Sequence, residues 1–128
     1  MSQGIAVLDG YSGCGKTTLL HRIREESDHG VLIVSYRVML DRMLKHIWKD
    51  ACTDVEDLWG DLPWDAIVCV EDVDLLKRKT ETQQLFIRVL SHTAQTRPVI
   101  VTGNNMEQHT PAFMTQLPAR IWQRRKTA

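Results

Sequence analysis

The chain has 128 residues and a formal net charge of zero, because sixteen Lys and Arg residues balance sixteen Asp and Glu residues. Hydrophobic residues make up 43% and charged residues 25%, which predicts one ordinary globular domain over residues 1–128. No apolar run approaches the roughly 20 residues of a membrane-spanning helix, and the neutral total argues against strong free-standing DNA binding.

The first predicted element is a β-strand over the apolar run Ile5 to Leu8, and it leads into a glycine-rich turn. The turn fits the phosphate-loop pattern G-x-x-x-x-G-K-[ST] and consists of Gly10, Tyr11, Ser12, Gly13, Cys14, Gly15, Lys16 and Thr17. Its glycines let successive backbone N–H groups point at phosphate oxygens, and the helix that follows adds its positive N-terminal end. We therefore predict that these residues and the adjoining Thr18 bind the phosphates of a nucleotide.

Two residues of this turn have predicted roles of their own. Lys16 is placed to bridge the β- and γ-phosphates, and the hydroxyl of Thr17 is placed to ligate Mg²⁺. The alternative is a glycine-rich turn that binds nothing. It is disfavoured because every fixed position of the pattern matches, between a strand and a helix.

The segments after the turn alternate between helix and strand. The first helix is expected to stop at Gly30, and a strand follows at Val31 to Val34. A second helix is predicted from about residue 36 to 49, with Ser35 as its cap. The pattern breaks from residue 51 to 64, where we expect a loop with one short helical turn.

A second candidate site follows the apolar run Ala66 to Val70, which delivers Glu71 and Asp72 at the carboxyl end of a strand. Ligands gather at that end in a parallel sheet, so the pair is typical of a Walker B arrangement. Glu71 would hold Mg²⁺ through its water shell, and Asp72 would orient or deprotonate the attacking water. Asp74 is an alternative acid, whose other expected role is a solvent-exposed residue or a helix cap.

A further strand is predicted at Val99 to Val101, and polar residues follow it. Thr102 or Asn104 could sense the γ-phosphate or orient water beside the acidic strand. An ordinary strand-to-loop turn is the alternative, because Asn and Gly are standard turn residues.

Helices are also expected over about 80–94 and 111–117. Thr80 to Gln83 have capping-box spacing, and Thr110 precedes Pro111 as a favourable N-cap. Four short apolar runs thus alternate with helical patterns. This alternation predicts an α/β fold with a mostly parallel sheet.

Cysteine usage and charge distribution add two expectations. Cys14, Cys52 and Cys69 are odd in number and lack C-x-x-C spacing, so a reducing cytoplasm is the expected location.

Residues 50–76 carry nine acids and no Lys or Arg, whereas Arg120, Arg124, Arg125 and Lys126 cluster near the end. Such polarity can steer head-to-tail self-association, although separated charge blocks are also typical of solvated faces.

Short stretches spread over nearly the whole chain carry a family resemblance. They are Gly15 to His21, Ile33 to Ser35, Val70 to Asp74, Glu81 to Phe86, Arg97 to Thr102 and Asn104 to Glu107. In this order of features the chain resembles the AAA+ ATPase core of the DnaA-type bacterial replication initiators and of the DnaC-type helicase loaders. The resemblance implies a three-layer α/β/α P-loop NTPase fold that binds ATP or ADP with Mg²⁺ and acts in replication initiation, helicase loading or their regulation.

The resemblance also implies an arginine finger. Leu117 to Arg120 resembles the segment that carries this residue in the family, which would put Arg120 against the γ-phosphate of a neighbouring subunit. A head-to-tail homo-oligomer or a related AAA+ protein is therefore the expected partner, with a replication protein as a further one. The chain departs from the initiators because it has no helical lid and no DNA-recognition domain, which leaves ATP hydrolysis open.

In these families the region between the second strand and the acidic strand helps contact single-stranded DNA. The corresponding residues here include Arg37, Arg42, Lys45 and Lys49, with Trp48 and Trp59 available for stacking. An ordinary solvated helix face is the alternative, because the acids from Asp50 onward would repel phosphate.

Two other functions compete with an ATP-controlled assembly protein. One is a non-enzymatic, shortened regulator that occupies the interface of a full-length AAA+ relative. The other is a small-molecule P-loop kinase, which is disfavoured because no compact Arg-rich insertion is present to close over the phosphates.

Overall fold

One parallel sheet organises the chain. The computed structural model describes residues 4–10, 15–28, 30–47, 58–60, 62–117 and 119–124. The five strands lie in the order β2-β3-β4-β1-β5. Their bounds are β1 (Ile5–Gly10), β2 (Val31–Ser35), β3 (Ile67–Glu71), β4 (Val99–Asn104) and β5 (Ala119–Arg124). Every pairing of neighbouring strands is parallel, so the predicted α/β class is confirmed.

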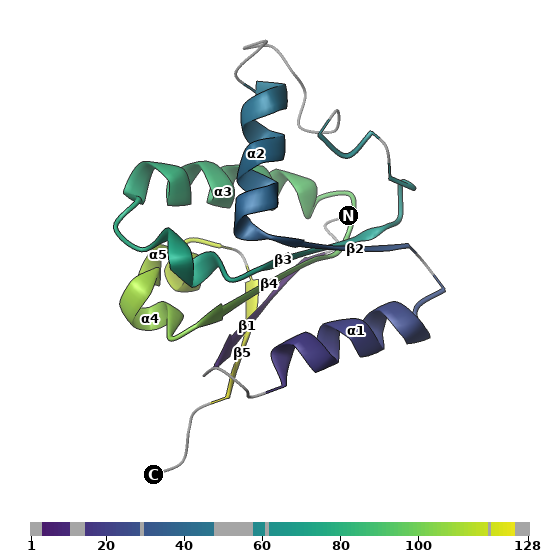
Figure 1. Ribbon diagram of the computed structural model, residues 1–128, viewed down its shortest axis with the longest axis horizontal. Helices are drawn as coiled ribbons and strands as arrows, with labels where there is room; N and C mark the ends of the chain where they lie inside the picture. Colours follow the sequence, from purple (N-terminus) through teal and green to yellow (C-terminus); the bar gives the residue numbers. More distant parts are fainter. Residues whose placement is uncertain are drawn as a thin grey trace.

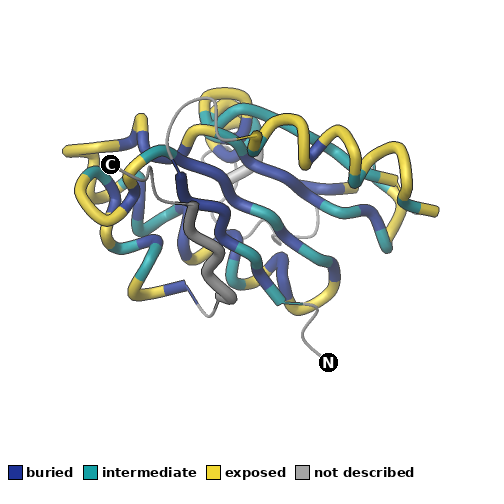
Figure 2. The backbone as a smooth tube through the Cα atoms, turned by 90° about the horizontal axis from the view of Figure 1, so that it is seen from below, coloured by how far each residue is buried: buried dark blue, intermediate teal, exposed yellow. Residues whose placement is uncertain are grey.

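Helices cover both faces of this sheet, which gives the predicted three layers (Figure 1). On one face lies α1 (Lys16–Glu26), which buries a single residue, Leu20. The opposite face carries α2 (Tyr36–Ile47), η2 (Val73–Leu76), α3 (Thr80–Thr93), α4 (Met106–His109) and α5 (Pro111–Thr115). Figure 2 shows β1, β3 and β4 as mostly buried, whereas β2 is of intermediate burial throughout.

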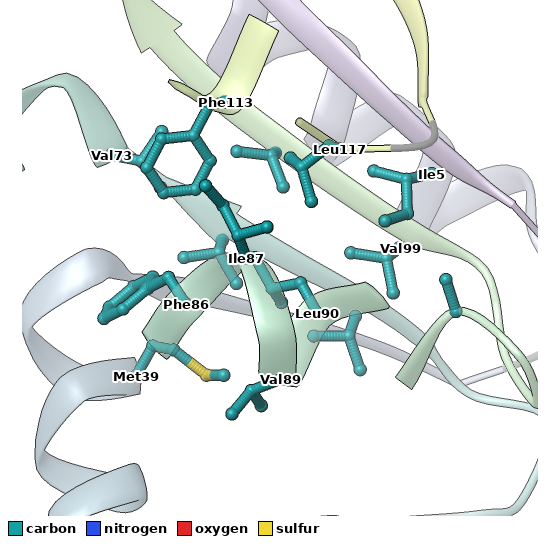
Figure 3. Packing of buried hydrophobic residues seen from close by; sticks show 14 of the residues in the cluster. Ile5, Met39, Val73, Phe86, Ile87, Val89, Leu90, Val99, Phe113 and Leu117 are labelled. Carbon is teal, nitrogen blue, oxygen red and sulfur yellow. The ribbon is translucent and has the colours of Figure 1, made fainter. Parts of the chain in front are cut away.

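Alternate residues of the strands enter two hydrophobic clusters. Val7, Val68 and Val101 face the larger cluster, which includes Phe86 of α3 and Phe113 of α5 (Figure 3). These two rings meet edge to face, with centroids 6.5 Å apart and planes at 79°. The smaller cluster, under α1, contains Leu8, Leu20 and Cys69. Because the strands are buried on both sides, they appear in the sequence as continuous apolar runs.

Some predicted boundaries are correct and others are wrong. Ser35 caps α2 as predicted, since the Val38 N–H donates to its Oγ at 3.2 Å. By contrast, α1 ends at Glu26 with Ser27 as its C-cap, so Gly30 is not its stop. α5 ends at Thr115, two residues before the predicted Leu117.

The predicted capping box at the start of α3 is also wrong. The N-cap residue is Lys79, without a side-chain cap bond, and Thr80 is already helical. Gln83 uses its side chain elsewhere, because its Nε2 donates to the carbonyl of Leu76 at 2.9 Å. The box spacing therefore located the helix to within one residue but assigned its polar groups to the wrong partners.

The fifth strand, β5, was not predicted. Its sequence, Ala119 to Arg124, holds only the apolar pair Ile121 and Trp122 between polar residues. Edge strands often carry charged residues, and β5 lacks the continuous apolar run that marks the other four strands. β5 pairs with β1 and makes it a central strand.

Trp59 corrects a second expectation, because it lies in the predicted loop but is fully buried. Its Nε1 donates to Thr93 Oγ1 at 2.9 Å, and the Arg42 guanidinium carbon lies 5.6 Å from the centroid of its ring. Arg42 also donates to the carbonyl of Leu58 at 3.1 Å. Leu58 and Trp59 are therefore held against α2 and α3, and the buried Trp59 ring is not available to stack on DNA. Trp48 and Lys49, from the same prediction, lie outside the described residues.

Within the described part of the chain, no helix has both the length and the apolar character needed to cross a membrane.

Candidate functional site

Several predicted site residues, Gly10, Lys16, Glu71, Asp72 and Asn104, lie at or next to the carboxyl ends of the strands. β4 lies between β1 and β3 and is parallel to both, and the carboxyl ends of β3 and β4 lead into η2 and α4 (Figure 1). Gly10 and Asn104 are direct register partners at these carboxyl ends. The strand order therefore places the end of the candidate phosphate loop beside the strand that carries Asn104.

The start of α1 has the backbone geometry that the glycine-rich pattern predicts. Gly15 is the N-cap residue in the left-handed region, with φ of 98°, and its carbonyl accepts the Leu19 N–H at 2.9 Å. Among the described residues other than its chain neighbours, no heavy atom lies within 4 Å of the position that a Gly15 Cβ would occupy, and the positive φ is what favours glycine there. The residues Tyr11, Ser12, Gly13 and Cys14 lie outside the described part of the chain.

Lys16 contacts the candidate sensor directly. Its Nζ donates to Asn104 Oδ1 at 2.6 Å, although the two residues are 88 positions apart in the sequence. Thr17 and Thr18 are exposed residues in the first turn of α1. Thr18 therefore does not contribute to the core, and Leu20 is the first buried residue of the helix.

The acidic pair, Glu71 and Asp72, lies at the carboxyl end of β3, which is separated from β1 by β4. Glu71 is the last residue of β3 and is partly buried, whereas Asp72 is exposed and left-handed, with φ of 64°. The Asp72 N–H donates to Thr102 Oγ1 at 3.4 Å. Thr102 thus holds the backbone beside the acids, and Asn104 is the residue that reaches Lys16.

Asp74 is neither solvent-exposed nor a helix cap. Its relative exposure is 7%, and its Oδ1 has no hydrogen-bond partner among the described residues. This oxygen lies 3.3 Å from the position that a Cβ on Gly103 would occupy. Asp74 is therefore buried beside Gly103 of β4, unlike the exposed Asp72.

Asp9 is a site residue that the sequence analysis missed. It is 6% exposed, and its Oδ1 accepts the Met106 N–H at 3.0 Å. An acid that closes an otherwise apolar strand directly before a phosphate-loop glycine was the available signal. A buried carboxylate needs hydrogen-bond donors, so its position predicts a partner in a neighbouring element.

Arg120 lies near the amino ends of the strands, away from the carboxyl ends that carry the other predicted site residues. It is the register partner of Ala6, near the amino end of β1, whereas the phosphate loop follows Gly10. The strand between Ala6 and Gly10 rises about 13 Å. Arg120 is thus separated from Lys16 of its own chain by most of the strand length.

Cys69 is chemically quiet. Burial, helped by the nearby charge of Glu71 and opposed by Arg24, raises the pKa of the Cys69 thiol to about 12. The thiol is therefore neutral at pH 7, and the thiolate is the reactive form. Cys69 is a packing residue of the cluster under α1.

The residues at the carboxyl edge fit a magnesium ion that is held mainly by water and phosphate. No group of three or more His, Cys, Asp or Glu side chains within the described ranges could enclose a metal by itself. Mg²⁺ in nucleotide sites is usually bound by one or two protein oxygens together with phosphate and water. The Thr17 hydroxyl and the Glu71 carboxylate are oxygen donors of this kind.

A basic pocket lies next to this edge, between the end of η2 and α4. It has a volume of about 330 Å³ and is lined by Lys77, Arg78, Gln108 and His109. Arg78 has φ of 66°, an uncommon backbone conformation for a long side chain. The pocket is thus a cationic surface held by a constrained turn.

A family model described as the ATPase family associated with various cellular activities (AAA) matches residues 6–125. No curated protein matches the sequence. Among solved structures, the replication initiator DnaA bound to AMPPCP and single-stranded DNA has 15% identity and a TM-score of 0.64, over 95% of this chain and 40% of its own. AMPPCP-bound DnaA from Aquifex aeolicus has 15% identity and a TM-score of 0.63, over 96% and 40%.

A structure that describes the basis of katanin self-assembly is similar to the same degree. It has 18% identity and a TM-score of 0.64, over 94% of this chain and 40% of its own. At these identities the likeness shows a common fold. This chain spans about 40% of the length of the structures it matches.

Proposed function

The chain belongs to the ATPase family associated with various cellular activities (AAA), and on that premise we propose that it binds ATP with Mg²⁺ and that the nucleotide controls head-to-tail assembly. The observation that carries the proposal is the 2.6 Å contact between Lys16 Nζ and Asn104 Oδ1 at the carboxyl edge. A γ-phosphate at that edge would engage both side chains, whereas ADP would engage only the lysine. The pair can therefore distinguish the two nucleotides.

The remaining residues of the site have complementary roles in the proposal. Gly10 to Thr18 bind the phosphates, with the backbone N–H groups at the start of α1 as donors. Thr17 and Glu71 hold Mg²⁺, which neutralises phosphate charge. The exposed Asp72 orients an attacking water, while Thr102 keeps its backbone in place.

Arg120 acts on the nucleotide of a neighbouring subunit in this proposal. Its place near the amino end of β1 supports action in trans, because it is far from the phosphate loop of its own chain. A cation supplied by a neighbour stabilises the charge of phosphoryl transfer only after assembly. Hydrolysis is then coupled to the head-to-tail contact.

We expect Arg120→Ala to leave ATP binding by the monomer unchanged and to lower assembly-dependent hydrolysis by about 1,000-fold, the lower range for an arginine finger. Phosphate release at increasing protein concentration measures this. Arg88→Ala, which removes an exposed cation from α3, is the matched control. A mixture of Arg120→Ala with Lys16→Ala protein should recover turnover, because one supplies the nucleotide site and the other the arginine. Retained turnover in Arg120→Ala alone would exclude the finger.

The basic pocket supports a second candidate function, contact with single-stranded DNA in replication initiation or helicase loading. One structure with this fold is a DnaA bound to single-stranded DNA. Lys77 and Arg78 offer cations around an open pocket that His109 also lines, whereas Arg42 and Trp59 make contacts within the fold. The pocket is therefore the better candidate for phosphate contact than α2.

We expect the double variant Lys77→Gln/Arg78→Gln to weaken binding of a fluorescein-labelled oligothymidylate. The slope of log affinity against log salt concentration should fall by about 1.4, because two phosphate contacts to a single strand are lost. Fluorescence anisotropy across a salt series measures both quantities. The double variant Arg37→Gln/Lys45→Gln removes two exposed cations from α2 and should change neither. The reverse result would move the DNA surface to α2.

A further inference from the structure

The turn that directly follows Asn104, the last residue of β4, is attached to the end of β1 by consecutive hydrogen bonds. The Asn105 N–H donates to the carbonyl of Gly10 at 3.2 Å, and the Met106 N–H donates to Asp9 Oδ1 at 3.0 Å. Asp9 and Gly103 are register partners on adjacent strands. The Asp9 carboxylate is thus the side-chain part of a contact that joins β1 to the turn after β4.

Asp9, and not the N-cap residue of α4, accepts the first backbone N–H of this helix. Asn105 is the N-cap of this short helix, but it makes no side-chain cap bond to the helix. Its Nδ2 instead donates to Gln108 Oε1 at 2.6 Å. The first N–H of α4 would be buried without a partner if the acid of β1 did not accept it, because Met106 is fully buried.

Two further features leave this turn little freedom. Asn105 is left-handed, with φ of 51°. A Cβ on Gly103 would lie 2.6 Å from Met106 Cγ and 2.7 Å from Met106 Sδ, so Met106 packs directly on the backbone of β4. The backbone on both sides of Asn104 is therefore constrained, at Gly103 by Met106 and at Asn105 by its left-handed conformation.

From these contacts we propose that Asp9 is a positioning residue, which holds Asn104 against Lys16 by accepting the Met106 N–H. The consequence for nucleotide discrimination rests on the proposed function. The positioning itself does not, because it is a property of the nucleotide-free protein. Asp9 touches no phosphate in this proposal and acts only through the turn.

The first test uses nucleotide-free, ¹⁵N-labelled protein and the side-chain amide resonances of Asn104, which Asn104→Ala identifies. Lys16→Ala gives their position when the lysine contact is lost. We expect Asp9→Ala to move the resonances toward that position, and Asp9→Asn, which keeps an acceptor oxygen, to leave them near the wild-type position. Asp28→Ala removes an exposed acid and is the matched control. Unmoved resonances in folded Asp9→Ala, or equal movement in Asp9→Asn, would overturn the proposal.

Amide hydrogen exchange of the wild type gives a check that does not require Asp9→Ala to fold. The Met106 amide should be protected relative to the exposed amides of the same turn. A Met106 amide that exchanges freely would overturn the proposal, because Asp9 would then not hold it.

The second test compares nucleotides. We expect Asp9→Ala to lose at least about tenfold in ATP affinity and less than about twofold in ADP affinity, with Asp9→Asn close to wild type. Equal losses for both nucleotides would mean that Asp9 only supports the fold, and would overturn the positioning role. If the wild type binds neither nucleotide, the proposed function fails, and the resonance and exchange measurements still decide whether Asp9 positions Asn104.

Discussion

Replacing Lys16 with alanine is expected to lower ATP affinity by at least about 100-fold, equivalent to roughly 2.7 kcal/mol. Lys16 is the first residue of α1, and its Nζ donates a hydrogen bond to Asn104 Oδ1, at the end of β4, at 2.6 Å. Charge-assisted hydrogen bonds to phosphate are among the strong ones in proteins. Displacement of a fluorescent ATP analogue measures the change.

Arg22→Ala is the matched control for this variant. Arg22 lies on the same helix, and its side chain is 73% exposed in a surface pair with Glu26. Its removal should change ATP affinity less than about twofold, because exposed pairs contribute little and the residue is more than a turn beyond Lys16. Equal losses in the two variants, or wild-type affinity in Lys16→Ala, would contradict the assignment of the phosphate loop.

Replacing Trp59 with alanine is expected to lower the free energy of unfolding by about 3–5 kcal/mol. The side chain is fully buried, it lies against the Arg42 guanidinium, and its Nε1 donates to Thr93 Oγ1. The change removes packing, leaves a cavity and deprives Thr93 of a donor. Small domains have only about 5–15 kcal/mol in total, so much of the stability should be lost. Urea unfolding followed by circular dichroism measures it.

Trp64→Ala tests whether the effect is specific to burial. Trp64 is five positions along the same segment and is 79% exposed. We expect a change within about 0.5 kcal/mol, as for most surface substitutions. A Trp59→Ala protein as stable as Trp64→Ala would show that the segment from Leu58 onward does not pack as described.

The fold and the main geometry of the site could be predicted from the sequence because their signals are local. Inner strands such as β3 are continuous apolar runs, and the phosphate loop needs glycines at fixed spacing. The order of these elements also placed Lys16 and Asn104 at the same edge of a parallel sheet, where the structure brings them into contact. Their roles toward a nucleotide stay predictions.

What could not be predicted depends on contacts between distant segments. Whether Trp59 is buried is decided by Thr93 and Arg42, which are far from it in sequence. The role of Asp9 could not be predicted because its partner, the Met106 N–H, follows β4, and the pairing of β4 with β1 is not visible in the sequence. β5 was missed because a polar edge strand has no apolar run.

The central claim, that this chain binds ATP at the carboxyl edge of its sheet, is tested most directly by calorimetric titration of the purified protein with ATP and Mg²⁺. The molar mass of the protein would be measured by light scattering before and after the titration. We predict saturable binding with a dissociation constant on the order of micromolar and a growth in mass with ATP that ADP does not produce. No heat of binding and no change in mass would contradict the account.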